Sequence, residues 1–146
     1  TGEMLLQIGI QMLEIVSEKI EVNLNSSKCI EYLSDLNNYI NLFPKDKIKN
    51  WESNKDFCTF SIQNTYVLDI KKKAVSKNKI HLKSEKKSPF NFNIIIDIQD
   101  LKPETCTAQI TSKADVSPML KVIVGKPLNE LFNYMANSIE KAILTE

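Results

Sequence analysis

The sequence predicts an α+β fold in which an antiparallel sheet of seven strands packs on a long C-terminal helix. The expected order is one strand, two short helices, six strands and the long helix. Six successive segments between residues 47 and 116 alternate apolar and polar side chains, as strands with one buried face do. The segment Ser117–Ile143 instead repeats its apolar residues at helical spacing, which predicts an amphipathic helix that needs a large apolar surface.

The first strand is expected over Gln11–Leu24. Its alternation changes phase near Ser17–Lys19, which predicts a β-bulge. Asn25 and the two serines after it offer side chains that can cap the start of a helix. Helix-weakening residues over Asp35–Asn38 predict two short helices rather than one, and Pro44 ends the second.

Six further strands follow at the regular spacing of a meander. Turn-forming residues separate them, among them the pairs Gln63-Asn64 and Ser88-Pro89. The expected strands are Lys47–Ser53, Phe57–Gln63, Tyr66–Val75, Lys79–Lys86, Phe90–Leu101 and Thr105–Val116.

The C-terminal helix has a clear start and an interruption. Ser117 can cap it, and Pro118 suits the first helical position. Gly125 and Pro127 lie inside the periodic stretch, and an internal proline removes a backbone hydrogen bond. We therefore expect a helix that is kinked or briefly broken near Gly125.

Length and composition describe an ordinary globular chain. With 146 residues, 42% hydrophobic and 25% charged, residues 1–146 are expected to form one domain. We expect residues 1–11 to be a flexible or non-native extension, with Met12 as the natural start. No run approaches the roughly 20 apolar residues of a membrane span.

The three cysteines, Cys29, Cys58 and Cys106, are far apart and odd in number. A disulfide framework is therefore not expected, and the thiols fit a reducing compartment, so the expected location is the cytoplasm. The net charge of +1 gives no general reason to expect nucleic acid. All 19 cationic side chains are lysines, so the bidentate recognition of phosphate that arginine provides is missing.

Several short motifs of the chain together match a known family. They are Ser26–Asp35, Tyr39, Phe43-Pro44, Asn50-Trp51, Ala114–Met119 and Lys126-Pro127-Leu128. With the order of the elements, they resemble the START-like (SRPBCC) superfamily, which includes polyketide cyclases/dehydratases and lipid-transport proteins, from about Met12 to Ile143. The resemblance implies the helix-grip fold, a curved sheet gripping the C-terminal helix. It also implies a cavity between sheet and helix that in relatives takes lipids, sterols, polyketides or other apolar molecules.

Apolar and aromatic side chains on the gripped faces are the candidates for lining such a cavity. The candidates are Trp51, Phe60, Tyr66, Leu68, Phe92, Ile94, Ile96, Met119, Ile123, Phe132 and Met135. The simpler interpretation of each is that it fills the core. Polar groups that could orient a ligand are Tyr66, Ser112, Trp51 and Lys72.

We identify no catalytic or metal-binding residues in the sequence. His81, the only histidine, lies between apolar residues and should point away from the face that Cys58 occupies. Asp69 and Asp97 lie at outward positions of their strands and are expected to be solvated. The cysteines and the histidine do not have zinc-ligand spacing, and the chain has no glycine-rich phosphate loop, so no cofactor is expected.

The segment Lys71–Lys87 contains eight lysines and one acidic residue. It could contact an anionic membrane surface weakly, or an acidic protein. Specific nucleic-acid recognition is not expected, since exposed aromatic residues and arginines do not accompany the lysines. Lysines also prevent edge strands from pairing with other chains, which is the simpler interpretation.

Three functions stay open at this point. The leading hypothesis is a non-enzymatic module that binds a small hydrophobic or amphipathic molecule between the sheet and the helix. An alternative is a cyclase/dehydratase-like enzyme acting on a polyketide or lipid-like substrate, in which Tyr66 or Lys72 assists proton transfer. Another is a protein-interaction module that uses the lysine-rich hairpin 71–87. The oligomeric state is left undetermined.

Overall fold

The structure is a computed structural model that describes residues 9–62 and 66–146. Its elements are β1 (Gln11–Val16), β2 (Ile20–Val22), α2 (Ser26–Leu33), a 3-10 helix η1 (Leu36–Asn41), β3 (Ile48–Asn54), β4 (Phe57–Ile62), β5 (Tyr66–Val75), β6 (Lys79–Ser84), β7 (Asn91–Lys102), β8 (Thr105–Val116) and α3 (Pro118–Leu144). The predicted turn at Gln63-Asn64 and most of the predicted N-terminal extension lie outside the described residues.

One antiparallel sheet of eight strands has the order β1-β8-β7-β6-β5-β4-β3, and β2 also pairs with β8. The first predicted strand is thus two strands, β1 and β2, which both pair with β8. The predicted bulge lies between them, near Ser17, where the alternation of apolar and polar residues changes phase. There, the Ser17 N–H donates to the Ile110 carbonyl, and the Ile110 N–H donates to Ser17 Oγ, both at 2.8 Å. Gln11 pairs with Val116, so the sheet already includes the last residue of the predicted extension.

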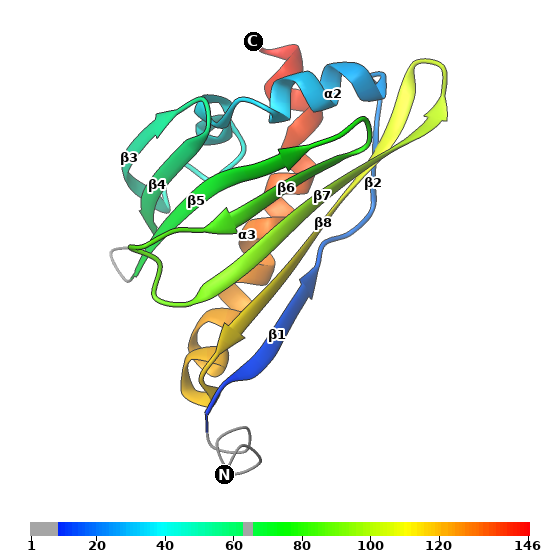
Figure 1. The fold of residues 1–146 in the computed structure, drawn as a ribbon. Helices are drawn as coiled ribbons and strands as arrows, with labels where there is room; N and C mark the ends of the chain where they lie inside the picture. Colours follow the sequence, from blue (N-terminus) through cyan, green and yellow to red (C-terminus); the bar gives the residue numbers. More distant parts are fainter. Residues whose placement is uncertain (1–8, 63–65) are drawn as a thin grey trace.

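The first short helix begins at the predicted cap Asn25, and the second begins at a cap that was not predicted, Asp35. Asn25 Oδ1 accepts from the Lys28 N–H at 2.9 Å, and Asp35 Oδ1 accepts from the Asn37 N–H at 3.0 Å. The second helix is a 3-10 helix. Figure 1 shows α2 crossing one end of the sheet, while α3 runs along the sheet's length.

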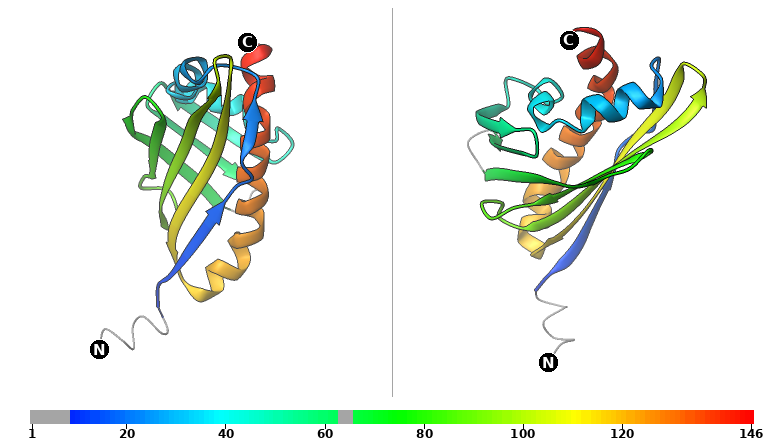
Figure 2. Two further views of the ribbon diagram at one scale, coloured as in Figure 1. Left: turned by 90° about the vertical axis from the view of Figure 1, so that its right-hand side faces the viewer. Right: turned by 45° about the horizontal axis from the view of Figure 1, so that its top comes forward.

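The sheet curves around α3, as Figures 1 and 2 show. The inward residues of α3 follow one stripe and are Val124, Leu128, Leu131, Phe132, Met135, Ala136, Ile139 and Ala142. Between Pro118 and Leu144 the helix is continuous, and its first turns lie at an angle to the rest in Figure 2, so of the two expected forms, a kink or a brief break, the helix has the kink. Pro127 is accommodated inside the helix, which loses one backbone hydrogen bond there.

Candidate ligand-binding site

The space directly between the sheet and α3 is almost filled by side chains. Phe60, Leu68, Phe92, Ile94, Ile96, Phe132 and Met135 are all buried there, with at most 4% of each exposed. A cavity of about 10 Å³ remains, lined by Leu68, Phe90, Phe92, Ser112, Leu128 and Phe132. This space holds about one water molecule. In this conformation these residues pack as a core, and their contact with a ligand stays a prediction.

Two of the predicted cavity residues face solvent instead. Met119 is 74% exposed and Ile123 is 58% exposed, so placing them on the gripped face was wrong. Their neighbour Val124 is wholly buried and begins the inward stripe that continues with Leu128. Met119 and Ile123 lie on another side of the first two turns, at an angle that a short apolar run did not reveal.

Trp51 belongs to an aromatic cluster rather than to an open pocket wall. Its ring stacks on Phe60 with centroids 5.3 Å apart, and Phe43 lies 4.8 Å from Phe60. Asn50 has a φ of 57°, in the left-handed region that asparagine tolerates, where the β3–β4 register shifts between Lys49 and Glu52. Trp51 is half-buried, and its Nε1–H donates to Ser53 Oγ at 3.0 Å.

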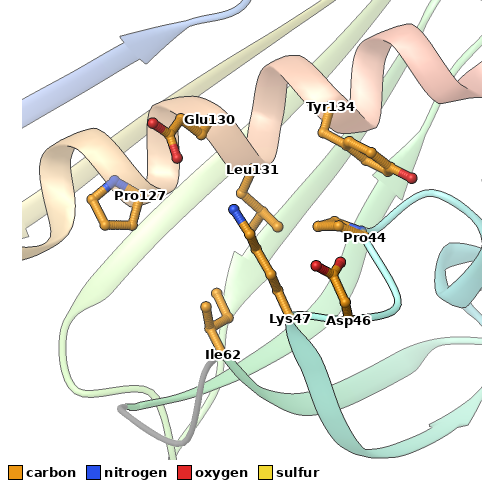
Figure 3. Close-up of a pocket in the computed structure, with 8 residues that line it drawn as sticks. All are labelled: Pro44, Asp46, Lys47, Ile62, Pro127, Glu130, Leu131 and Tyr134. Carbon is orange, nitrogen blue, oxygen red and sulfur yellow. The ribbon is translucent and has the colours of Figure 1, made fainter.

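A larger hollow lies beside this core, between α3 and one edge of the sheet (Figure 3). Its volume is about 330 Å³, at the lower end of the range of small-molecule pockets. The residues that line it are Pro44, Asp46, Lys47, Ile62, Pro127, Glu130, Leu131 and Tyr134. They come from the segment between η1 and β3, from the end of β4, and from α3.

The hollow combines apolar walls with charged groups. Leu131 and Ile62 are almost buried, at 4% and 5% exposed, and the rings of Pro44 and Pro127 add apolar surface. Asp46, Lys47 and Glu130 bring both signs of charge to the same space, as Figure 3 shows. This arrangement suits a molecule with an apolar body and a polar end.

The sequence contained signals for part of this hollow. Pro44 and Pro127 were recognised as a helix end and an interruption, and both belong to the motifs of the family resemblance. Ile62 has the same strand parity as Phe60 and so faces the helix. Asp46, Lys47 and Glu130 gave no signal, because isolated charges usually mark a solvated surface.

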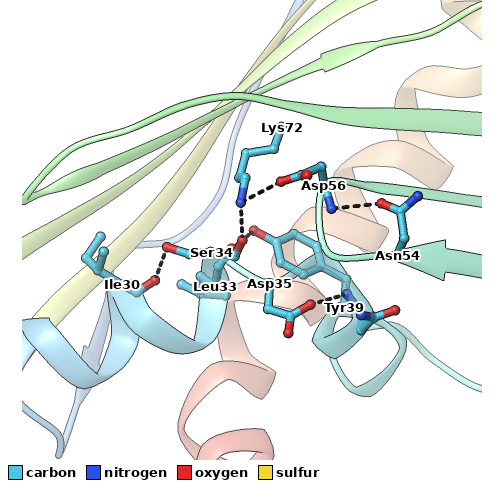
Figure 4. Close-up of polar contacts among 9 residues, drawn as sticks. Ile30, Leu33, Ser34, Asp35, Tyr39, Asn54, Asp56 and Lys72 are labelled. Carbon is cyan, nitrogen blue, oxygen red and sulfur yellow. Dashed lines mark hydrogen bonds and ion pairs between the residues drawn. The ribbon is translucent and has the colours of Figure 1, made fainter.

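Lys72, one of the groups that could orient a ligand, lines neither the hollow nor the small cavity. Its Nζ donates to the Ser34 carbonyl at 2.8 Å and pairs with Asp56 Oδ1 at 2.9 Å (Figure 4). The hydrogen bond and the charge of Lys72 lower the pKa of the Asp56 carboxyl. Lys72 thus connects β5 with the end of α2 and with the β3–β4 turn.

Other side chains complete this structural junction. The Tyr39 hydroxyl donates to the Leu33 carbonyl at 2.7 Å, and Ser34 Oγ donates to the Ile30 carbonyl at 2.6 Å (Figure 4). The last carbonyls of a helix have no intrahelical partner, so these side chains satisfy the end of α2. The junction holds α2 and η1 in place, and η1 leads to Pro44 of the hollow.

Tyr66, one of the predicted ligand-orienting residues, has an unsatisfied polar group. Its hydroxyl is buried and has no hydrogen-bond partner among the described residues. Burial raises its pKa to about 12. Tyr66 of β5 is paired with Ile62 on the neighbouring strand β4, and Ile62 lines the hollow. Ser112 is buried beside the small cavity.

The residues considered for catalysis do not come together. Cys58 is wholly buried, whereas half-buried His81 contacts Asn93 Oδ1 at 2.9 Å through Nε2. Asp69 is only 4% exposed, so its expected solvation was wrong. The segment after β6 covers it, and the Lys87 N–H donates to Asp69 Oδ2 at 2.9 Å. Among the described residues, no three potential metal ligands gather at one point.

The lysine-rich hairpin does not lie at an edge of the sheet. β5 and β6 are inner strands, paired with β4 and β7 on their outer sides, so the edge-protection interpretation is wrong for most of the hairpin. Pairing with β4 ends at Lys71. Beyond it, Lys73, Lys77 and Lys79 are exposed near the turn of the hairpin, where the Asn78 side chain donates to the Ile98 carbonyl of β7 at 2.8 Å.

Neither protein-family models nor curated proteins give a match to this sequence. Several solved structures, in contrast, are similar to the structure of this chain. Truncated norcoclaurine synthase from Thalictrum flavum is similar with a TM-score of 0.71 and 14% identity, over 94% of this chain and 96% of that chain. The same enzyme in complex with dopamine and hydroxybenzaldehyde gives a TM-score of 0.70 and 15% identity, over 96% and 91%.

A START superfamily protein from Mycobacterium smegmatis is also similar, with a TM-score of 0.66 and 16% identity, over 94% of this chain and 99% of that chain. Identities this low establish the fold alone. The fold is the START-like helix-grip fold that the sequence resemblance implied. In the described parts of the chain, no helix is both long enough and apolar enough to cross a membrane.

Proposed function

We propose that this chain binds a small hydrophobic or amphipathic molecule in the hollow between α3 and the side of the sheet formed by β3 and β4. The observation that supports this most is the lining of the hollow, in which apolar walls and charged groups enclose about 330 Å³ beside the core. The interior cavity of about 10 Å³ is too small for a ligand without rearrangement. The binding site thus lies beside the predicted cavity, on a neighbouring face of the same helix.

Affinity would come mainly from removing apolar surface from water. Each 100 Å² of buried apolar surface contributes about 2.5 kcal/mol before the cost of immobilising the ligand. The walls at Leu131, Ile62 and Pro127 provide such surface. Lys47 and Glu130 would orient a polar end, since charge-assisted hydrogen bonds are directional.

The test fills the hollow with a side chain that does not disturb the core. Glu130 is exposed and lines the hollow, while its neighbour Asn129 is also exposed but does not line it. Glu130→Trp should weaken binding of an apolar fluorescent dye at least tenfold, and Asn129→Trp should leave it unchanged. Glu130→Gln separates the loss of charge from the added bulk.

Equal dye affinities of Glu130→Trp and Asn129→Trp would show that the hollow is not the binding site. Native mass spectrometry of the purified chain, followed by extraction, would identify any molecule that copurifies. Small hydroxylated aromatic amines and aldehydes are suitable first probes, because the similar norcoclaurine synthase structure contains dopamine and hydroxybenzaldehyde. Turnover of such a probe would favour the alternative of an enzyme.

The surroundings of Lys72 and Tyr66, the two residues considered for proton transfer, do not favour the alternative of a cyclase/dehydratase-like enzyme. Lys72 is held by Ser34 and Asp56. Tyr66, with a pKa of about 12, stays protonated at neutral pH and can donate a hydrogen bond but not act as a base.

A second candidate function is an interaction of the exposed lysines at the end of the β5–β6 hairpin with an anionic partner. The exposed Lys73, Lys77 and Lys79 favour it. Binding of an acidic partner would weaken steeply with salt, and Glu130→Trp would not change it. Binding that is insensitive to salt would contradict this candidate.

A further inference from the structure

Two of the three cysteines lie against each other in the core. Cys29 Sγ and Cys106 Sγ are 3.6 Å apart, although 77 positions separate them in the sequence. Both residues have no exposed surface. Cys58 is also buried, but its sulfur has no such partner among the described residues. The fold thus assembles a dithiol that the spacing of the cysteines did not predict.

The two thiols belong to elements that are held together from both sides. Cys29 lies in α2 and Cys106 lies near the start of β8, where it pairs with Val22 of β2. At the beginning of α2, Ser26 Oγ donates to Asp100 Oδ1 of β7 at 2.5 Å. Neighbouring contacts therefore fix the two sulfur atoms near each other, rather than leaving them on mobile segments.

We propose that Cys29 and Cys106 form a site of reversible oxidation, at which a disulfide joins α2 covalently to the sheet. A disulfide requires about 2.05 Å between the sulfur atoms, so the thiols would approach each other by roughly 1.5 Å. Side-chain rotation together with a small shift of α2 would have to supply this displacement.

The chemistry balances with a peroxide as the oxidant. One thiol attacks the peroxide, the O–O bond breaks, and a sulfenic acid and one water form. The second thiol then attacks the sulfenic sulfur, the S–S bond forms, and a second water leaves. Two thiols lose two electrons and two protons in total, and the peroxide is reduced to two waters.

The reaction is expected to be slow in the folded protein. Burial raises the pKa of Cys29 to about 12, and it also raises the pKa of Cys106. The thiolate is the reactive form, and neither sulfur is open to solvent. Oxidation therefore depends on transient opening of α2, and the site would respond to sustained oxidant rather than to a brief pulse.

The disulfide would change stability and the wall of the hollow. A cross-link that closes a loop of this length typically restricts the unfolded chain enough to raise the Tm by about 10 °C. α2 and η1 lead directly to Pro44 and Asp46, so fixing α2 should also slow entry into the hollow. Only this second effect rests on the proposed function.

The test treats the full chain with hydrogen peroxide and measures intact mass, thiol content and Tm. The expected result is the loss of two hydrogen atoms, a peptide pair linking Cys29 to Cys106, and a higher Tm that a reducing agent reverses. The Cys58→Ser variant should behave in the same way. Cys29→Ser and Cys106→Ser should not form the link.

A link that involves Cys58, or sulfinic acid at Cys29 without a Cys29–Cys106 link, would overturn the proposal. The readout uses the unsubstituted chain, so a variant that folds poorly does not decide the result. Dye exchange is measured separately on the oxidised chain. If the link forms and the dye does not bind, the oxidation site stands and the proposed hollow fails.

Discussion

The same turns of α3 present two neighbouring faces that differ sharply. Leu128 and Phe132 face the middle of the sheet, where side chains leave about 10 Å³. Leu131, at the border of the inward stripe, and the exposed Tyr134 face the segment between η1 and β3, where about 330 Å³ stays open. One face forms core, and the other forms a pocket wall.

The difference follows from what lies opposite the helix. Strands β5, β7 and β8 offer alternating apolar side chains that point at Leu128 and Phe132 and fill the space between them. The segment opposite Leu131 offers a proline and two charged residues, Asp46 and Lys47. Charged side chains keep their contact with water, so this face does not close.

Truncation on the two faces should have very different costs. Phe132→Ala should lower the free energy of unfolding by about 3–5 kcal/mol, because Phe132 is 3% exposed and its removal leaves a cavity. Tyr134→Ala should lower it by less than about 1 kcal/mol, because Tyr134 is 47% exposed. Urea denaturation measures both. Similar losses for the two variants would contradict the distinction between the faces.

Removing Lys72 should loosen the junction that supports one wall of the hollow. Lys72→Met leaves the Ser34 carbonyl without its donor and Asp56 without its partner, so the Tm should fall by several degrees. Dye affinity should fall with it, since the junction positions the segment that leads to Pro44. An unchanged Tm in a thermal scan would show that the contact is not stabilising.

The same contact predicts a pH effect with a definite sign. Lys72 lowers the pKa of Asp56 in the folded state. The stabilisation is therefore present above the ordinary aspartate pKa of about 3.9 and is lost as the pH falls through the lowered folded value. Lys72→Met should reduce this acid dependence, which urea unfolding at a series of pH values measures. An identical acid dependence in both chains would contradict the assignment.

The smallest effect is expected at Gly125. A methyl group added there would meet no atom within 4 Å, and the residue lies inside a continuous helix. Gly125→Ala should therefore raise stability by about 0.5–1 kcal/mol. Together with Pro127→Ala it should straighten α3 and slow dye exchange in stopped-flow measurements. Unchanged exchange would show that the bend does not gate the hollow.

The sequence predicted the elements well because their signals are local. Alternation placed all six later strands to within about two residues, and the phase change near Ser17 located the separation of β1 from β2. The capping residues Asn25 and Ser117 were also recognised. The sequence did not decide between a kink and a break in α3, because the packing of its inward stripe, which outweighs the cost of Gly125 and Pro127, depends on the rest of the fold.

The site was predicted less completely because it depends on contacts between distant segments. The hollow combines Asp46, Ile62 and Glu130, which no spacing in the sequence connects. Burial of Asp69 depends on the segment after β6, and the partners of Lys72 lie on two other elements. The alternation along a strand predicted which face of the sheet each side chain is on. It did not predict which residues of other segments each side chain contacts.

The most direct test of the proposed site is methyl NMR of the isotope-labelled chain during titration with the apolar dye. The methyl groups of Ile62 and Leu131 line the hollow, while those of Leu68 and Leu128 line the small interior cavity. We predict that the Ile62 and Leu131 signals shift with dye concentration and that the Leu68 and Leu128 signals stay in place. Shifts confined to Leu68 and Leu128 would contradict the proposal and place the ligand inside an expanded core.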